Sequence, residues 1–125
     1  MSSLLLDSNS LIAYAANSKR IGPKARALLN RSALYFSSLS IAELRLKELR
    51  VPGFRLGLTT KFLNSIGIEE VQFSSRDLDG LVTLETKDPF DLLLAAQANS
   101  RGLSLVTSDL EILASDLAFT VDLTA

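Results

Sequence analysis

The sequence contains neither cysteine nor histidine. Without cysteine the chain has no disulfide framework, no zinc–thiolate site and no thiol nucleophile. Without histidine it has no Ser-His-Asp or Cys-His catalytic group, and it offers no imidazole ligand to a metal ion. Any metal that the chain holds must therefore be bound through oxygen atoms, which favours magnesium, manganese or calcium over zinc or copper.

The sequence also lacks a long apolar run. Residues 1–7 contain three successive leucines without a preceding positive charge, which fits neither a secretory signal peptide nor a membrane span. We therefore expect a cytoplasmic protein with no membrane segment. The chain of 125 residues is 47% apolar and 22% charged, which is typical of a single globular domain, here expected over residues 1–125.

Charge is unevenly distributed, although the formal net charge is only −1. Residues 1–61 carry ten Lys or Arg against three acidic residues, whereas residues 62–125 carry three Lys or Arg against eleven acidic residues. A basic region beside an acidic pocket can guide a phosphate backbone towards that pocket. The same distribution also fits ordinary solvated helix faces, so charge alone leaves both interpretations open.

Short apolar runs alternate with longer segments of helical character. This alternation predicts right-handed βαβ units and an α/β fold with a mainly parallel sheet of four to five strands. We expect strands at residues 3–6, 33–39, 70–73, 103–107 and 118–122. We expect helices at residues 9–16, 23–30, 40–49, 54–65, 77–85, 89–100 and 110–114.

Four acidic residues lie where an apolar run gives way to a helix signal: Asp7, Glu43, Asp91 and Asp109. Ligands of open α/β sheets bind beyond the carboxyl ends of the strands, so these four side chains should meet at one edge of the sheet. Four carboxylates in one place repel each other strongly unless a cation lies between them. The pattern therefore predicts a divalent-metal site and metal-assisted hydrolysis.

Each of these acids also has a structural explanation as a helix cap. Asp7 and Asp109 precede expected helices, and residues 40–43 have the spacing of a capping box. Residues 88–91, Asp-Pro-Phe-Asp, place a cap, a first-turn proline and an acid in favourable order. Capping and metal binding are compatible, but capping alone does not explain why all four acids fall at the same edge.

Four sequence blocks carry these acids: residues 4–7 (Leu-Leu-Leu-Asp), 40–44 (Ser-Ile-Ala-Glu-Leu), 88–98 (Asp-Pro-Phe-Asp-Leu-Leu-Leu-Ala-Ala-Gln-Ala) and 105–109 (Leu-Val-Thr-Ser-Asp). In their order and over nearly the whole chain, the blocks resemble those of PIN-domain ribonucleases. The closest resemblance is to the VapC-type toxins of bacterial toxin–antitoxin pairs. The third block is the most specific part.

The resemblance implies a PIN-like three-layer α/β/α sandwich and a magnesium- or manganese-dependent endoribonuclease. It places Asp7, Glu43, Asp91 and Asp109 at the family's four acidic positions, as catalytic residues and metal ligands, and Thr107 at the hydroxyl position before the last acid. It also implies an RNA substrate, a homodimer, and a small antitoxin protein that holds the toxin inactive.

The chain departs from close relatives of that family at several positions. It has Ser8 and Asn9 where relatives often carry Thr-His, Thr86 and Lys87 where they often carry His-Arg, and Leu92 where Arg is common. These departures leave two alternatives open: a catalytically weak PIN-fold module that binds a partner, and a general RNA-processing nuclease without an antitoxin.

Other residues are candidates for supporting roles. Ser8 and Asn9 could hydrogen-bond a ligating carboxylate or a phosphate, or could cap the first helix. Asp88 could be an outer carboxylate of the metal site or only a helix cap. On the helix after Glu43, the cations Arg45, Lys47 and Arg50 fit either contacts with RNA phosphates or a solvated helix face. Tyr14, Tyr35 and Phe36 are candidates for stacking on bases, although Phe36 is expected in the core.

An antitoxin would need an apolar surface. Residues 11–16 and 54–63 are candidates for the two walls of an apolar groove that accepts a helix of the partner. The same positions also fit the core or a homodimer contact, so the sequence does not decide between these uses.

Overall fold

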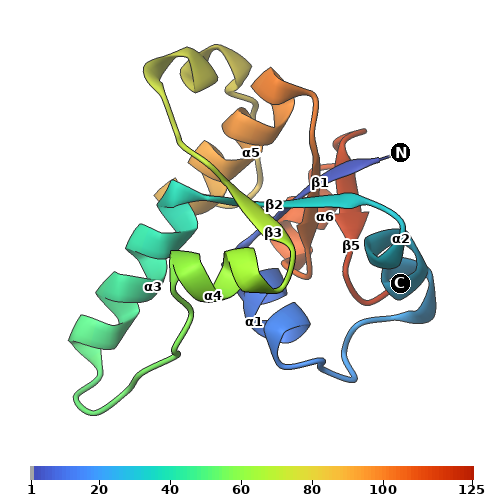
Figure 1. The fold of residues 1–125 in the computed structure, drawn as a ribbon. Coiled ribbons are helices and arrows are strands. Elements are labelled where there is room, and N and C mark those ends of the chain that lie inside the picture. The colour runs from blue at the N-terminus through green and yellow to red at the C-terminus, as the bar shows by residue number, and fades with distance from the viewer. Residues whose placement is uncertain (1) are drawn as a thin grey trace.

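Leu4, Leu5 and Leu6 are all buried, although successive side chains of a strand point to opposite faces of its sheet. The first strand must therefore be covered by protein on both faces, as parallel sheets usually are. The computed structural model, which describes residues 2–125, has this arrangement: a central sheet with helices on both faces (Figure 1). The expected three-layer α/β/α fold is confirmed.

The sheet has five strands, all parallel, in the order β3-β2-β1-β4-β5. The strand order changes direction between β1 and β4, and ligands of such sheets bind at the carboxyl end of this switch point. Leu6 pairs with Phe36 of β2 and with Val106 of β4, so three strands end within one residue of each other. The strands are β1 Ser3–Leu6, β2 Ala33–Ser37, β3 Ile68–Val71, β4 Ser104–Thr107 and β5 Thr120–Asp122.

Six α-helices and one 3₁₀-helix are present in residues 2–125. Pro89 begins the long helix α5, which ends at Gly102 in the left-handed conformation, as expected for a glycine C-cap. The helices are α1 Ser8–Ala15, α2 Pro23–Asn30, α3 Ser38–Arg50, α4 Thr60–Ser65, η1 Ser75–Gly80, α5 Pro89–Arg101 and α6 Leu110–Ala114. Within residues 2–125, no helix combines the length and the apolar character needed to cross a bilayer.

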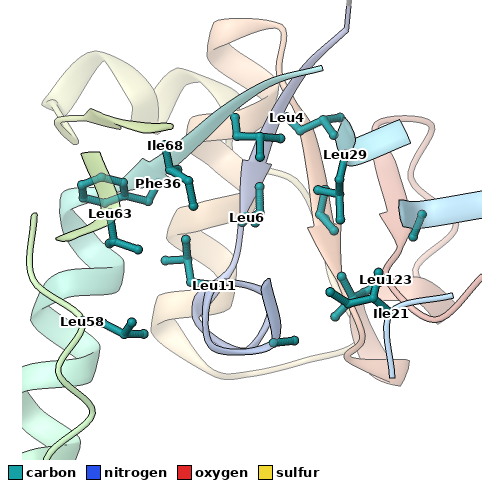
Figure 2. Packing of buried hydrophobic residues seen from close by; sticks show 14 of the residues in the cluster. Leu4, Leu6, Leu11, Ile21, Leu29, Phe36, Leu58, Leu63, Ile68 and Leu123 are labelled. Atoms are coloured by element: carbon teal, nitrogen blue, oxygen red, sulfur yellow. The ribbon is translucent and has the colours of Figure 1, made fainter. Parts of the chain in front are cut away.

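The core is divided by the sheet into two apolar clusters. Leu4 and Leu6 lie in a cluster that also contains residues of α1, α2, α3 and α4, including Leu11 and Leu63 (Figure 2). Leu5 points the other way, into a second cluster formed with α5 and α6. Because alternate leucines of β1 are buried on opposite faces of the sheet, the strand is held between two helical layers. The position of Asp7, which follows β1 directly, is thereby fixed as well.

The expected helix over residues 54–65 is wrong in its first half, because α4 comprises only Thr60–Ser65. The side chain of Thr59 accepts a hydrogen bond from Phe62 N and so starts the helix there. Before it, Gly57 has φ of 70°, a left-handed conformation that interrupts a helix. The backbone NH of Leu56 donates to Glu48 of α3, so this segment is held in a non-helical path.

The expected helix over residues 77–85 is also wrong, since only the short 3₁₀-helix η1 forms, at Ser75–Gly80. A capping box between Ser74 and Asp77 starts it. Gly80 lies so close to α5 that a Cβ atom there would be 2.3 Å from the carbonyl oxygen of Ala96. The third strand, expected at residues 70–73, lies two residues earlier, at Ile68–Val71.

Candidate active site

Asp7 follows β1 directly and is almost fully buried, with 5% of its surface exposed. Its Oδ1 accepts a hydrogen bond of 2.9 Å from Ser10 N, so the expected role as N-cap of α1 is confirmed. Burial raises the pKa of Asp7, as does the charge of Glu43, while hydrogen bonds from Thr107 and Ser10 act in the opposite direction. The net direction is upward, so this carboxylate is held where its charge is costly.

Asp109 lies beyond the carboxyl end of the neighbouring strand β4 and caps α6. Its Oδ1 accepts hydrogen bonds from Glu111 N at 2.8 Å and from Ile112 N at 3.1 Å, as the capping interpretation predicted. Asp109 N donates to the fully buried hydroxyl of Thr107, at 3.0 Å. Thr107 therefore contacts both Asp109 and Asp7, and ties the ends of β4 and β1 together.

Glu43 comes from α3, and its local setting differs from the expected capping box. The helix begins at Ser38, because Ser37 is its N-cap and accepts a hydrogen bond from Leu39 N. Ser40 is inside the helix and fully buried, and its hydroxyl has no hydrogen-bond partner within residues 2–125. The Glu43 carboxylate accepts a hydrogen bond from the buried hydroxyl of Ser8. Of the two roles considered for Ser8, this is the bond to a carboxylate rather than the helix cap.

Asp91 lies in the first turn of α5, after the cap formed by Asp88, whose Oδ1 accepts from Phe90 N at 2.9 Å. Burial raises the pKa of Asp91, and the charges of other carboxylates raise it further, to about 7. The contributing carboxylates, in decreasing order of effect, are Asp88, Asp109, Asp7 and Glu43. The other three predicted acids, Asp7, Glu43 and Asp109, therefore all lie close enough to Asp91 to disfavour its charge.

The structure separates the other sequence candidates. Asn9 is exposed, and in residues 2–125 no hydrogen bond joins its side chain to an acid. Thr86 was not expected to contribute, yet it is buried and donates a 3.4 Å hydrogen bond to Asp91 Oδ2. Its hydroxyl also accepts from Asp88 N, at 3.2 Å. A threonine two residues before Asp88 is a sequence pattern typical of a turn closed by a side-chain hydroxyl, so this contact could have been predicted from the sequence.

The basic and aromatic candidates also differ in setting. Arg45 is bound within the fold, because its guanidinium donates to the Leu58 carbonyl and its Nε lies 3.1 Å from Glu48. Lys47 and Arg50 have no ion pair within residues 2–125. Phe36 is fully buried in the core, as expected, and the half-buried Tyr14 and Tyr35 pack against the two core clusters.

The donors of this site fit magnesium or manganese in their chemistry. They are carboxylate and hydroxyl oxygens, which both ions prefer, and four of the carboxylates lie near enough to Asp91 to add to the effect of burial on its pKa. No three acidic residues within residues 2–125 are already arranged to hold a metal ion. Binding at distances of about 2.0–2.2 Å therefore requires the side chains to close around the ion. An open cavity of about 510 Å³ beside Asp91 and Asp109 leaves space for this movement.

An apolar groove is also present where the sequence suggested one. It has a volume of about 230 Å³ and lies between α1 and the segment that leads into α4. Ile12 and Ala15 form part of one wall, and Leu56 and Phe62 part of the other. Leu11, which the sequence placed in this groove, is fully buried in the core instead.

Comparison with known proteins gives one family and several similar folds. The family model described as the PIN domain matches residues 4–116. Among solved structures, VapBC2 from Rickettsia felis bound to a DNA fragment from their promoter has a TM-score of 0.64 at 18% identity, covering 96% of this chain and 99% of that one. VapBC-1 from nontypeable Haemophilus influenzae has a TM-score of 0.68 at 18% identity, with 98% and 99% covered. A toxin–antitoxin complex from Klebsiella pneumoniae has a TM-score of 0.63 at 20% identity, with 95% and 96% covered. No curated protein sequence matches the chain.

Proposed function

The chain belongs to the PIN domain family, and from this premise we propose that it is a magnesium- or manganese-dependent endoribonuclease, the toxin of a toxin–antitoxin pair. PIN domains are nucleases, so the chain is a hydrolase of nucleic acid. One observation carries the proposal further: burial, together with carboxylates from four separate sequence blocks, raises the pKa of Asp91 to about 7. Such crowding of charge is costly to a fold and is relieved by a bound cation.

In this proposal Asp7, Glu43, Asp91 and Asp109 hold the metal. When bound, the ion supplies charge stabilisation to the phosphodiester and makes an attacking water more acidic. The other residues keep the carboxylates in place. Thr107 contacts Asp7 and Asp109. Ser8 donates a hydrogen bond to Glu43. Thr86 donates to Asp91 and accepts from Asp88 N.

The antitoxin part of the proposal rests on a different surface. The apolar groove between α1 and α4 has no charged lining residue, which suits an apolar helix of a partner. The similar fold from Klebsiella pneumoniae was solved as a toxin–antitoxin complex. We extend that arrangement to this chain, and with it a cytoplasmic location and a homodimer. A basic side chain of the antitoxin would neutralise the acidic cluster in place of the metal.

Cleavage of RNA by the purified protein tests the proposal. We expect single-stranded RNA to be cut with magnesium and to remain intact with EDTA. Asp7→Asn should remove cleavage while keeping the helix cap, because asparagine caps helices about as well as aspartate. Asp79→Asn is the matched control, since Asp79 is exposed on η1 at the other end of α5 and should leave cleavage unchanged. Cleavage that persists with EDTA or in Asp7→Asn would contradict the proposal.

One observation favours a second candidate function, a catalytically weak module that binds a partner. No three carboxylates within residues 2–125 are already arranged for a metal, and Leu92 stands where relatives of the VapC type often carry arginine. This alternative predicts no magnesium-dependent cleavage together with stable binding of the small partner. A nuclease without an antitoxin would give the reverse result.

A further inference from the structure

A cavity of about 380 Å³ lies between α3 and the start of α5, beside the acidic cluster. The two helices are in contact, and Figure 1 shows them meeting at one end of the sheet. Glu43 and Asp88 belong both to the lining of this α3–α5 cavity and to the acidic cluster. The remaining lining includes Lys47, Arg50 and Phe90. A molecule in this cavity would therefore be adjacent to the proposed catalytic carboxylates.

Two cations in the α3–α5 cavity have no partner in the part of the chain that the structure describes. Lys47 and Arg50 are three residues apart on α3, which places them on neighbouring positions of one helix face. Neither forms an ion pair or a side-chain hydrogen bond with any of residues 2–125. Arg45 on the same helix is by contrast held by Leu58 and Glu48. Lys47 and Arg50 are therefore free to bind an external anion such as a phosphate.

The aromatic ring in the cavity does not contribute to the core. Phe90 is half-buried, yet it belongs to neither apolar cluster. Its backbone is held in place, because Phe90 N donates to the Asp88 cap and Pro89 precedes it at the start of α5. An aromatic ring on a fixed stretch of backbone, partly open to solvent beside two cations, is a stacking surface for an unpaired base.

The lining of the α3–α5 cavity distinguishes its occupant from that of the apolar groove. The groove is lined by Ile12, Leu56, Phe62 and other uncharged residues. The cavity is lined by two free cations, an aromatic ring and the carboxylates of Glu43 and Asp88. The cations and the ring match the phosphate and base of a nucleotide better than they match an apolar helix, and the two carboxylates belong to the acidic cluster beside the cavity.

We propose that the α3–α5 cavity is a subsite for one unpaired nucleotide of the RNA substrate. Phe90 stacks on the base, and Lys47 and Arg50 bind the adjoining phosphate. This inference rests on the proposed function and adds to it the place where one base of the strand binds, which must be unpaired because a base in a duplex does not expose a face for stacking. Lys47, Arg50 and Phe90 are positioning residues, which hold the strand while the carboxylates act on the next phosphodiester.

The two cations can be tested by binding alone. The affinity for a fluorescent single-stranded RNA is measured in an Asp91→Asn background without divalent ions, so that the RNA is not cut. Lys47→Gln with Arg50→Gln should weaken binding at least fivefold and lower the slope of log affinity against log salt by about 0.7, the value for one phosphate of a single strand. Lys24→Gln with Arg31→Gln removes the same charge from exposed positions at and beside α2, and should leave the slope unchanged.

The ring is tested by its dependence on the base. Phe90→Leu keeps apolar volume but removes the stacking surface, and should weaken binding about tenfold, within the range seen when base–aromatic stacking is removed. Phe90→Tyr should restore the affinity. With an RNA that has abasic positions but the same backbone, Phe90→Leu should have no effect, whereas the double Gln variant should still bind weakly.

The outcomes separate the subsite from the proposed function. If the unmutated chain cuts RNA but all three substitutions leave affinity unchanged, the subsite is wrong and the nuclease assignment stands. If the substitutions break a dimer or an antitoxin complex and leave RNA affinity intact, the cavity is a protein interface and the subsite is again wrong. If the unmutated chain neither binds nor cuts RNA, the proposed function fails and the subsite with it.

Discussion

The hydroxyl of Ser8 donates a hydrogen bond to the carboxylate of Glu43, across 35 residues of sequence. The contact joins the first residue of α1 to the middle of α3. Ser8 is buried, so water competes little for this bond, and the bond fixes one orientation of Glu43. The orientation of the Glu43 carboxylate thus depends on Ser8, the residue that follows Asp7. The positions of Asp7 and Glu43, two proposed metal ligands, are therefore linked.

Ser8→Ala should therefore reduce cleavage without unfolding the protein. The released Glu43 side chain should raise the magnesium concentration needed for half-maximal cleavage roughly tenfold or more, as loss of a supporting contact often does. The free energy of unfolding should fall by only about 0.5–1.5 kcal/mol. Ser65→Ala, which removes an exposed hydroxyl bond in α4, is the control. A variant with an unchanged magnesium requirement would show that the contact of Ser8 does not position Glu43 for metal binding.

Asp91→Asn should abolish metal-dependent cleavage and stabilise the metal-free protein. Burial and neighbouring carboxylates raise the pKa of Asp91 from 3.8 to about 7, so the folded state binds a proton more tightly than the unfolded state. The wild-type fold therefore loses stability as pH rises from about 4 to about 7, and the loss is complete above that range. The neutral asparagine avoids this loss.

The size and measurement of the Asp91 effect follow from its partial exposure. After allowance for screening and for about 0.3–1 kcal/mol of lost helix-dipole stabilisation, the variant should be more stable by about 1–2 kcal/mol at pH 8. Urea unfolding with EDTA at several pH values measures the difference, which should vanish near pH 4. A less stable variant at pH 8 would indicate that Asp91 mainly supports α5.

Asp77 should stabilise the fold down to low pH through its contact with Arg101. Burial alone would raise the pKa of Asp77, but hydrogen bonds from Arg101, Ser100 and Ser74 N, with the Arg101 charge, lower it to about 2. The stabilisation is therefore complete above pH 4 and is lost as pH falls from about 4 to about 2. Asp77→Asn should lower the free energy of unfolding at pH 7 by about 2 kcal/mol and flatten its decline in acid. Equal acid curves for Asp77→Asn and the exposed control Asp79→Asn would contradict this role.

Phe62→Glu should prevent binding of the antitoxin and leave cleavage intact. Phe62 is 39% exposed and lines the apolar groove, so a charge there should repel an apolar helix without disturbing the core. Co-expression with the proposed antitoxin, followed by size exclusion, measures the complex. Leu81→Glu alters an apolar side chain that is 55% exposed outside the groove, and should leave the complex intact. Co-elution of Phe62→Glu with the partner would exclude the groove as the docking site.

The sequence predicted the parts of this fold that depend on local signals. Pro23 and Pro89 mark the first residues of α2 and α5, and Asp109 marks the start of α6. The start of α3 was misplaced, because Ser37, Ser38 and Ser40 are all able to cap and only tertiary packing selects Ser37. The 3₁₀-helix η1 was extended too far for a similar reason, since its end depends on the contact of Gly80 with α5.

The candidate site was predictable to a similar degree. Because parallel strands end at one edge, the placement of Asp7 and Asp109 at the same edge of the sheet followed from the strand–helix alternation alone. The partners of the carboxylates did not follow from it. The contact of Ser8 with Glu43 and that of Thr86 with Asp91 depend on how α1, α3 and α5 pack, and no local pattern specifies those distances.

The nearly level ends of β1 and β4 have a consequence for how this protein tolerates change. Leu6 pairs with Val106, and this pairing sets the separation of the residues that follow, Asp7 and Thr107. A slip of one residue between the two strands would turn Thr107 to the other face of the sheet and move Asp109 away from Asp7. The geometry of the polar site thus depends on the pairing of two fully buried apolar residues, which are not themselves part of the site. Substitutions that loosen this pair should impair the chemistry before they unfold the chain.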